Sequence, residues 1–188
     1  MAADLGYRGL PMNWVTMPDQ FTLAAFDRLL GVREDPRRLF AQIVLASSHA
    51  PWVPVPDILP WEAIGDGQVY NAVATSGDPP EVVWRDQDRV RAQYRLALDY
   101  ALRSVFEYIR LKADDPPLFL VIGDHQAAAH IALDDRAEVP IHAIGPAALV
   151  DRLHLIAQTE GLIPDADVPV LGMEDMRDLL LRAFEVRE

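Results

Sequence analysis

Leu118-Phe-Leu-Val-Ile-Gly-Asp-His125 is the stretch of this 188-residue sequence that most constrains the fold. Five consecutive apolar residues, Leu118 to Ile122, have the length and β-branched content of a strand buried on both faces, as in a parallel sheet covered by helices. Gly123 ends this run, and Asp124 and His125 follow it directly. The stretch therefore predicts a carboxylate and an imidazole at the carboxyl end of a strand, where open α/β sheets bind their ligands.

Asp124 and His125 have two interpretations that the sequence leaves open. Carboxylate oxygen and imidazole nitrogen both bind zinc or manganese, so the pair could hold a divalent metal ion. Alternatively, Asp124 caps a helix that begins near Gln126, and His125 packs or faces solvent. A metal site normally needs three or four protein ligands, so His130 and His142 are additional candidate metal ligands. A histidine in the middle of a strand, such as His142, is alternatively a core or strand-face residue.

Composition and charge narrow the class of protein. With 51% hydrophobic and 24% charged residues, the sequence is typical of a globular protein, and its length fits a single domain spanning residues 1–188. The net charge of −12 argues against nucleic acid as the main partner, because phosphate neutralisation needs clustered Lys and Arg. There is no cysteine, which excludes disulfides and thiolate metal sites.

A second buried strand is predicted at Phe40 to Ala46, and it runs directly into Ser47-Ser48-His49. A long helix is predicted at about Arg89 to Lys112, where apolar residues recur at three- and four-residue intervals. This helix joins the second strand to Leu118 to Ile122, which implies a right-handed crossover and a parallel pair. Both strand ends then lie at the same edge of the sheet, so we expect His49 to converge with the Asp-His pair.

The remaining patterns complete an α/β fold class with a mostly parallel sheet flanked by helices. Glu138 to Gly145 predicts a third short strand, and Pro140 suggests an edge or strand-start position. Residues 51–84 are predicted to form a long loop, and its prolines and tryptophans favour a loop packed on the rest of the domain over a flexible linker. Further helices are predicted at residues 18–31, with Asp19 as the N-cap, and at residues 147–159 and 173–186. Residues 126–133 are predicted to form a short helix or a loop.

Two other chemistries are poorly supported by the sequence. A Ser-His-Asp triad that uses Ser47 or Ser48 is conceivable, but neither serine lies in the Gly-x-Ser-x-Gly turn typical of such nucleophiles. Dinucleotide binding is disfavoured because no Gly-x-Gly-x-x-Gly segment follows any predicted strand.

Two segments carry a family resemblance. Val121-Ile-Gly-Asp-His-Gln126 resembles the Gly-Asp-His metal-binding segment of the alkaline phosphatase superfamily. Leu45-Ala-Ser-Ser-His-Ala-Pro-Trp52 resembles the Ser-His-x-Pro-aromatic segment of its sulfatase-like branch, which includes lipoteichoic acid synthases and phosphoethanolamine transferases. The order of the segments is also similar, because a helix with Tyr100-Ala-Leu-Arg-Ser104 lies between them and Val139 to Gly145 follows. The resemblance covers residues 40–146.

The resemblance implies an alkaline phosphatase-like α/β/α sandwich, of which this chain would be the carboxyl-terminal part. It implies that Asp124 and His125 bind a divalent metal, zinc or manganese, and that His49 contacts the phosphate or sulfate group of a small ester substrate. His142 matches a further metal ligand of two-metal members. The family's nucleophile lies upstream, and no segment before His49 matches it.

The resulting expectation is a fragment of a metal-dependent phospho- or sulfo-ester hydrolase or transferase, inactive alone, either truncated or the product of a split gene. By resemblance, the longer parent would be anchored in a membrane with this domain outside the cytoplasm. The competing interpretation is a non-catalytic α/β binding or assembly module. Both interpretations predict a homo-oligomer formed through an exposed sheet edge.

Overall fold

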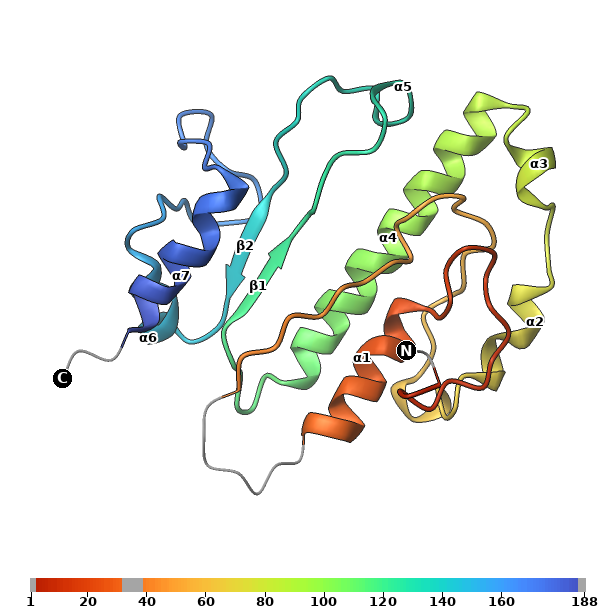
Figure 1. The fold of residues 1–188 in the computed structure, drawn as a ribbon, viewed down its shortest axis with the longest axis horizontal. Helices are drawn as coiled ribbons and strands as arrows, with labels where there is room; N and C mark the ends of the chain where they lie inside the picture. Colours follow the sequence, from red (N-terminus) through yellow and green to blue (C-terminus); the bar gives the residue numbers. More distant parts are fainter. Residues whose placement is uncertain (1–2, 32–38, 186–188) are drawn as a thin grey trace. The chain divides into compact units, whose positions relative to one another are not determined.

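The computed structural model of this chain describes residues 3–31 and 39–185. The chain divides into two compact units, Met1–Arg110 and Leu111–Glu188, which are described separately here. Figure 1 shows the ribbon coloured along the sequence, with the helices of the first unit from red to green and the strands of the second in cyan and green.

The first unit is helical and is built on two longer helices. Helix α1 (Asp19–Phe26) is extended by one turn of π-helix (Asp27–Gly31), and α4 (Gln87–Leu111) follows much later in the chain. Short helices lie between them: the 3-10 turns Trp61–Ala63 and Gln68–Tyr70, then α2 (Asn71–Ala74) and α3 (Pro80–Val83). The predicted helices at residues 18–31 and 89–112 are confirmed within one or two residues.

Helix α4 forms for the reasons that the sequence suggested. Asp86 caps it, because its Oδ1 accepts hydrogen bonds from the backbone N–H groups of Asp88 (2.9 Å) and Arg89 (3.2 Å). Its buried side chains recur at intervals that place them on one face: Val90, Ala97, Tyr100, Ala101, Ser104 and Tyr108. The tyrosine hydroxyl of Tyr108 donates to Asp27 at 3.3 Å, which joins α4 to the end of the first helix.

The core of the first unit gathers side chains from segments far apart in the chain. Its buried members are Met12, Val15, Phe21, Ala25, Ile64 and Tyr70. The proline- and tryptophan-rich loop packs as predicted, since Trp52 is buried and its ring stacks on Trp84 with centroids 5.6 Å apart and lies 5.2 Å from Tyr94. Within this loop, Gly67 has a φ of 89°, and the ring of Tyr7 occupies the place of a Cβ.

The second unit contains the sheet. Strand β1 (Phe119–Ile122) pairs with β2 (Ile141–Ile144) in antiparallel register, with Phe119 opposite Ile144 and Ile122 opposite Ile141. The helices of this unit are α5 (Ala129–Ala132), α6 (Ala147–Val150), the 3-10 turns Asp151–Leu153 and Met173–Asp175, and α7 (Met176–Phe184). The predicted helix at residues 147–159 is therefore shorter than expected.

One face of this two-stranded sheet is covered by helices. Leu120 and Ala143, which are opposite each other in the register, pack against a core cluster of Leu153, Ile156 and Ala183. Helix α7 supplies further apolar side chains to this cluster, and its predicted amphipathic character is confirmed for Met176–Phe184. The predicted end of this helix at Val186 lies outside the described residues.

The predicted α/β/α sandwich with a mostly parallel sheet is wrong. Among residues 3–31 and 39–185 the sheet has two strands, and they are antiparallel. Residues 39–46 form no strand, and the side chains of Phe40 and Val44 are 81% and 78% exposed. Because the described residues before α4 contain no strand of this sheet, the predicted crossover is not formed, and β1 pairs instead with β2, which follows it in the chain.

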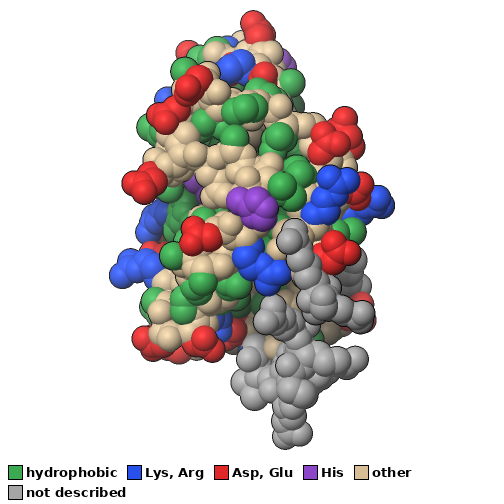
Figure 2. All heavy atoms as spheres, turned by 90° about the vertical axis from the view of Figure 1, so that its left-hand side faces the viewer, with side chains coloured by type: hydrophobic (Ala, Val, Ile, Leu, Met, Phe, Trp, Pro, Cys, Tyr) green, Lys and Arg blue, Asp and Glu red, His purple; other side chains and the backbone are tan. Residues whose placement is uncertain are grey.

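The surface carries both signs of charge. Figure 2 shows acidic, basic and apolar side chains interspersed on one face of the molecule. Within the described ranges, no helix has both the length and the apolar character needed to cross a lipid bilayer.

Candidate functional site

The predicted metal ligands lie in an exposed turn directly after β1. The side chain of Asp124 is 88% exposed and that of His125 73% exposed. Asp124 Oδ1 accepts a hydrogen bond from the backbone N–H of His125 at 3.0 Å, which fixes the carboxylate against its neighbour. The second oxygen, Oδ2, lies 3.6 Å from Nε2 of the imidazole. A carboxylate and an imidazole nitrogen therefore face each other at the end of a strand.

The imidazole of His125 is oriented by its other nitrogen. Nδ1 lies 2.8 Å from the backbone carbonyl oxygen of Gln126. Because a carbonyl can only accept, Nδ1 carries the proton in this contact and the lone pair of a neutral ring is on Nε2. Histidine ligands of metals are typically held in this way, with one ring N–H donating to a carbonyl and the other nitrogen left for the ion.

The capping interpretation of Asp124 is not what the structure shows. Helix α5 begins at Ala129, and its N-cap is Ala128, with no side-chain hydrogen bond at that position. The carboxylate of Asp124 instead contacts His125, one residue further along the chain. Its conformation is thus set within the turn, several residues before any helix.

His142 lies in the same sheet but points its ring to a different partner. It is opposite Val121 in the β1–β2 register, and its Nε2 lies 2.9 Å from the carbonyl oxygen of Leu162. In the part of the chain that the structure describes, no three side chains of His, Asp or Glu come together as a metal site would require. Asp124 and His125 by themselves would therefore offer two of the three or four protein ligands that zinc needs.

The segment Ala46–Ala50, in the first unit, forms the turn that carries His49. The backbone N–H of His49 donates to the carbonyl of Ala46 at 3.0 Å, and the exposed imidazole places Nδ1 2.7 Å from the carbonyl of Ala50. As with His125, Nδ1 is the protonated nitrogen in this contact. Nε2 can therefore donate to an anion only when the ring is doubly protonated.

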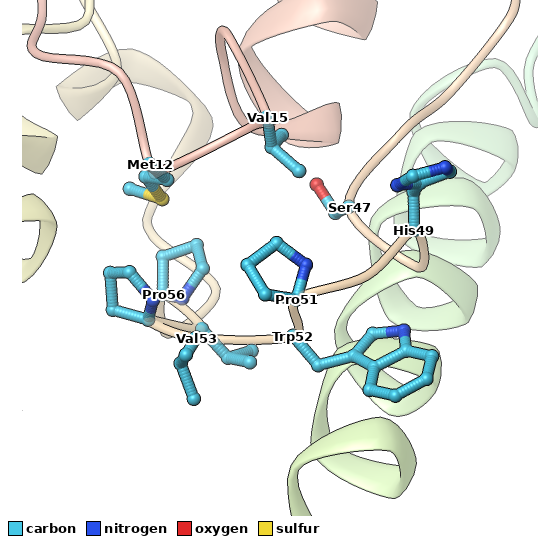
Figure 3. A pocket seen from close by; sticks show the side chains of 10 residues that line it. Met12, Val15, Ser47, His49, Pro51, Trp52, Val53 and Pro56 are labelled. Carbon is cyan, nitrogen blue, oxygen red and sulfur yellow. The ribbon is translucent and has the colours of Figure 1, made fainter. Parts of the chain in front are cut away.

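A small hollow lies beside this turn (Figure 3). The hollow is shallow and partly open to solvent. Its lining is mostly apolar: Met12, Val15, Ser47, His49, Pro51, Trp52, Val53, Pro54, Val55 and Pro56. Figure 3 shows the hydroxyl of Ser47 directed between Val15 and Pro51, with the ring of His49 at the edge. The hydroxyl of Ser47 accepts a hydrogen bond from the backbone N–H of Asp19 at 3.0 Å. Its partner is thus a backbone group and not a histidine ring, so this contact does not support a Ser-His-Asp triad that uses Ser47.

The residue that sequence reasoning misjudged is Asp19. We predicted it as the N-cap of α1, but it is the first residue of the helix, and Pro18 is the cap. Its side chain is buried, and Oδ1 accepts from the backbone N–H groups of Ala46 (2.8 Å) and Ser47 (2.9 Å). Burial raises the pKa of Asp19, although these hydrogen bonds act in the opposite direction.

The next residue, Gln20, was also missed. Its side chain is fully buried and exchanges two hydrogen bonds with the backbone of Leu59: Nε2 donates to the carbonyl at 2.6 Å, and Oε1 accepts from the N–H at 3.0 Å. Oε1 also accepts from the hydroxyl of Tyr70 at 3.2 Å. The one available signal was its spacing, since Gln20 lies three and four residues before the apolar Leu23 and Ala24.

The predicted site residues are divided between the two units. His49 belongs to Met1–Arg110, whereas Asp124, His125 and His142 belong to Leu111–Glu188. We expected His49 to meet the Asp-His pair because two parallel strands would end at the same edge of one sheet. That premise is wrong, since residues 40–46 are not a strand of the β1–β2 sheet. Asp124 and His125 are brought together with each other, and His142 is engaged elsewhere.

No family model, no curated protein and no solved structure matches this chain.

Proposed function

We propose that this chain carries part of a metal-dependent site for small phospho- or sulfo-esters, with Asp124 and His125 as two of the metal ligands. The observation that carries the proposal is the orientation of His125, whose Nδ1 is bound to a carbonyl while Nε2 faces Asp124 Oδ2 at 3.6 Å. Two ligands of one tetrahedral zinc ion, each about 2.0–2.1 Å from it, lie about 3.3 Å apart. A small rotation of the exposed carboxylate would bring the pair to that spacing.

In this proposal the metal is zinc or manganese, and it would polarise the phosphoryl or sulfuryl oxygens of the ester. His49 belongs to the other unit, and we propose separately that its ring, with Nε2 protonated, contacts an anionic group. The resemblance to sulfatase-like enzymes supports these assignments through the same residues. Because two ligands do not complete a site, we expect the chain alone to bind metal weakly and to show no turnover of phosphate or sulfate esters.

Calorimetric titration of the whole chain with Zn²⁺ and with Mn²⁺ tests the assignment. We expect weak binding in the wild type and a further loss in Asp124→Ala. The matched control is Asp167→Ala, which removes another exposed carboxylate from the same unit and should leave the titration unchanged. Binding that is equal in Asp124→Ala and wild type would remove Asp124 from the site. Tight one-to-one binding that Asp124→Ala abolishes would show a complete site and overturn the partial one.

A second candidate is a non-catalytic binding or assembly module, favoured by the incomplete sheet. Within the described residues β1 and β2 pair only with each other, so each strand has an edge that no further strand occupies. Large apolar side chains are also exposed in this unit, including Leu162, Ile163, Val170 and Leu181. Such edges and side chains recruit a second copy or a partner strand.

Sedimentation velocity over a range of protein concentrations tests this assembly. We expect a homo-oligomer whose proportion rises with concentration. A charge next to the sheet edge, introduced as Ile122→Lys at a side chain that is 43% exposed, should shift the equilibrium to monomer. A wild-type chain that remains monomeric at high concentration would exclude self-assembly through the sheet.

A further inference from the structure

Asp19 joins the start of α1 to the turn that carries His49. Its backbone N–H donates to Ser47 Oγ at 3.0 Å, while its Oδ1 accepts from the N–H groups of Ala46 at 2.8 Å and Ser47 at 2.9 Å. The contact is reciprocal, because each partner donates to and accepts from the other. It connects positions 27 and 28 residues apart in the sequence, and so it is tertiary rather than local helix capping.

The turn is also held on its other side. The indole Nε1 of Trp52 donates to the carbonyl of Ser48 at 2.8 Å, and the ring of Trp52 is itself stacked on Trp84. The backbone of His49 bonds back to Ala46, the residue that Asp19 holds. His49 is therefore an exposed side chain on a backbone that is fixed before and after it.

Asp19 is buried, so its hydrogen bonds to the turn must compensate for the cost of removing a carboxyl group from water. The residue is 1% exposed, and a buried carboxyl is costly unless its hydrogen bonds compensate. Oδ1 makes both of the side chain's hydrogen bonds, and Oδ2 is buried with no hydrogen-bond partner among the described residues. The contact therefore uses one oxygen as an acceptor, and an amide oxygen could take its place.

We propose that Asp19 is the positioning residue of His49, holding the Ala46–Ala50 turn on the first turn of α1 so that the imidazole is presented at the edge of the hollow. This role rests on the proposed function, in which the ring of His49 contacts an anionic group. Asp19 itself touches no substrate, because its side chain is enclosed and its contacts are with the backbone of the turn.

Three variants of the full chain separate positioning from general stability. Asp19→Asn keeps an oxygen acceptor in place of Oδ1, whereas Asp19→Ala removes it. Ala25→Gly weakens the same helix at a buried core position without touching the turn, so it controls for destabilisation of the first unit. The readouts are hydrogen exchange of the Ala46 and Ser47 amides, the NMR signal of the His49 ring, and its shift on addition of inorganic phosphate.

We expect Asp19→Ala to speed exchange at Ala46 and Ser47 by about tenfold, relative to amides in α4, and to move the His49 ring signal. Asp19→Asn should preserve both, and Ala25→Gly should leave the ring signal and the relative exchange unchanged. The phosphate shift of His49 should weaken in Asp19→Ala alone.

Two results would overturn the positioning role: a His49 ring signal and exchange that Asp19→Ala leaves unchanged, or the same changes in Ala25→Gly as in Asp19→Ala. If inorganic phosphate does not move the His49 signal even in the wild type, the anion-binding role of His49 in the proposed function fails. The exchange rates and the ring signal still decide whether Asp19 holds the turn.

Discussion

Substitution of Gln20 by alanine should destabilise the first unit strongly. The side chain is fully buried and makes hydrogen bonds of 2.6 Å and 3.0 Å with Leu59 and one of 3.2 Å with the hydroxyl of Tyr70. Its removal leaves the buried hydroxyl of Tyr70 and two backbone groups of the half-buried Leu59 without this partner, each costing about 1–3 kcal/mol before water compensates. The lost side chain also leaves a cavity, so we expect a total of about 3–5 kcal/mol.

Urea unfolding followed by tryptophan fluorescence measures this cost in the right part of the chain. All four tryptophans of the sequence, at positions 14, 52, 61 and 84, lie in the first unit. Tyr70→Phe is the control, since it removes one hydrogen bond and should cost about 1 kcal/mol. The double variant should lose less than the sum of the two singles, because the substitutions share that bond. A loss below about 1 kcal/mol for Gln20→Ala would refute a structural role for the Gln20–Leu59 contact.

Three further predictions concern pH and the second unit. Burial raises the pKa of Asp19 above its unfolded value of 3.8, so the folded protein holds a proton on this carboxyl over a pH range in which the unfolded chain has lost it. The free energy of unfolding should therefore fall as pH rises from about 4 through the raised pKa, and Asp19→Asn, which has no proton to lose, should gain stability relative to wild type over that range. Urea titrations at several pH values measure this, and a difference that stays constant with pH would contradict it. Burial also raises the pKa of Tyr70 to about 12, so stability should fall above about pH 10, and the fall should be smaller in Tyr70→Phe. Leu153 is 2% exposed in the core of the second unit, so Leu153→Ala should lower the stability of that unit by about 2–4 kcal/mol. Faster hydrogen exchange in β1 and β2 would measure this loss, and unaltered exchange would contradict the role of Leu153 in that core.

Local patterns in the sequence predicted most of the elements. The spacing of apolar residues predicted α4 and α7, and the apolar runs predicted β1 and β2 close to their observed bounds. The sequence allows Asp86 or Asp88 as the residue that opens α4, and Asp86 is the one that caps it, through hydrogen bonds to the residues that follow it. Each of these signals lies within about one turn or one strand, so neighbouring residues in the sequence are enough to predict the element.

Pairing could not be predicted from such signals. An apolar run is compatible with a parallel or an antiparallel neighbour, and the neighbour is specified by distant contacts. Phe40 to Ala46 has the composition of a buried strand, yet it lies in the first unit, where its end is bound by the side chain of Asp19. The error in fold class follows from this one segment, because the predicted crossover needed it as the first strand.

The roles of Asp19 and Gln20 were hidden for a related reason. A Pro-Asp-Gln sequence before an apolar stripe predicts a helix start whether the aspartate caps its own helix or reaches across to another segment. The turn after β1 is the opposite case: Asp124 and His125 are adjacent, and their contact depends on one turn of backbone, so the sequence alone could place them together.

The most direct test of the central claim is paramagnetic broadening of histidine signals by substoichiometric Mn²⁺. The chain has five histidines, which provide internal controls for one another. If Asp124 and His125 are partners in a metal site, the ring signals of His125 should broaden first, and Asp124→Ala should remove that selectivity. Equal broadening of all five histidines, or selective broadening of His125 that persists in Asp124→Ala, would contradict the assignment.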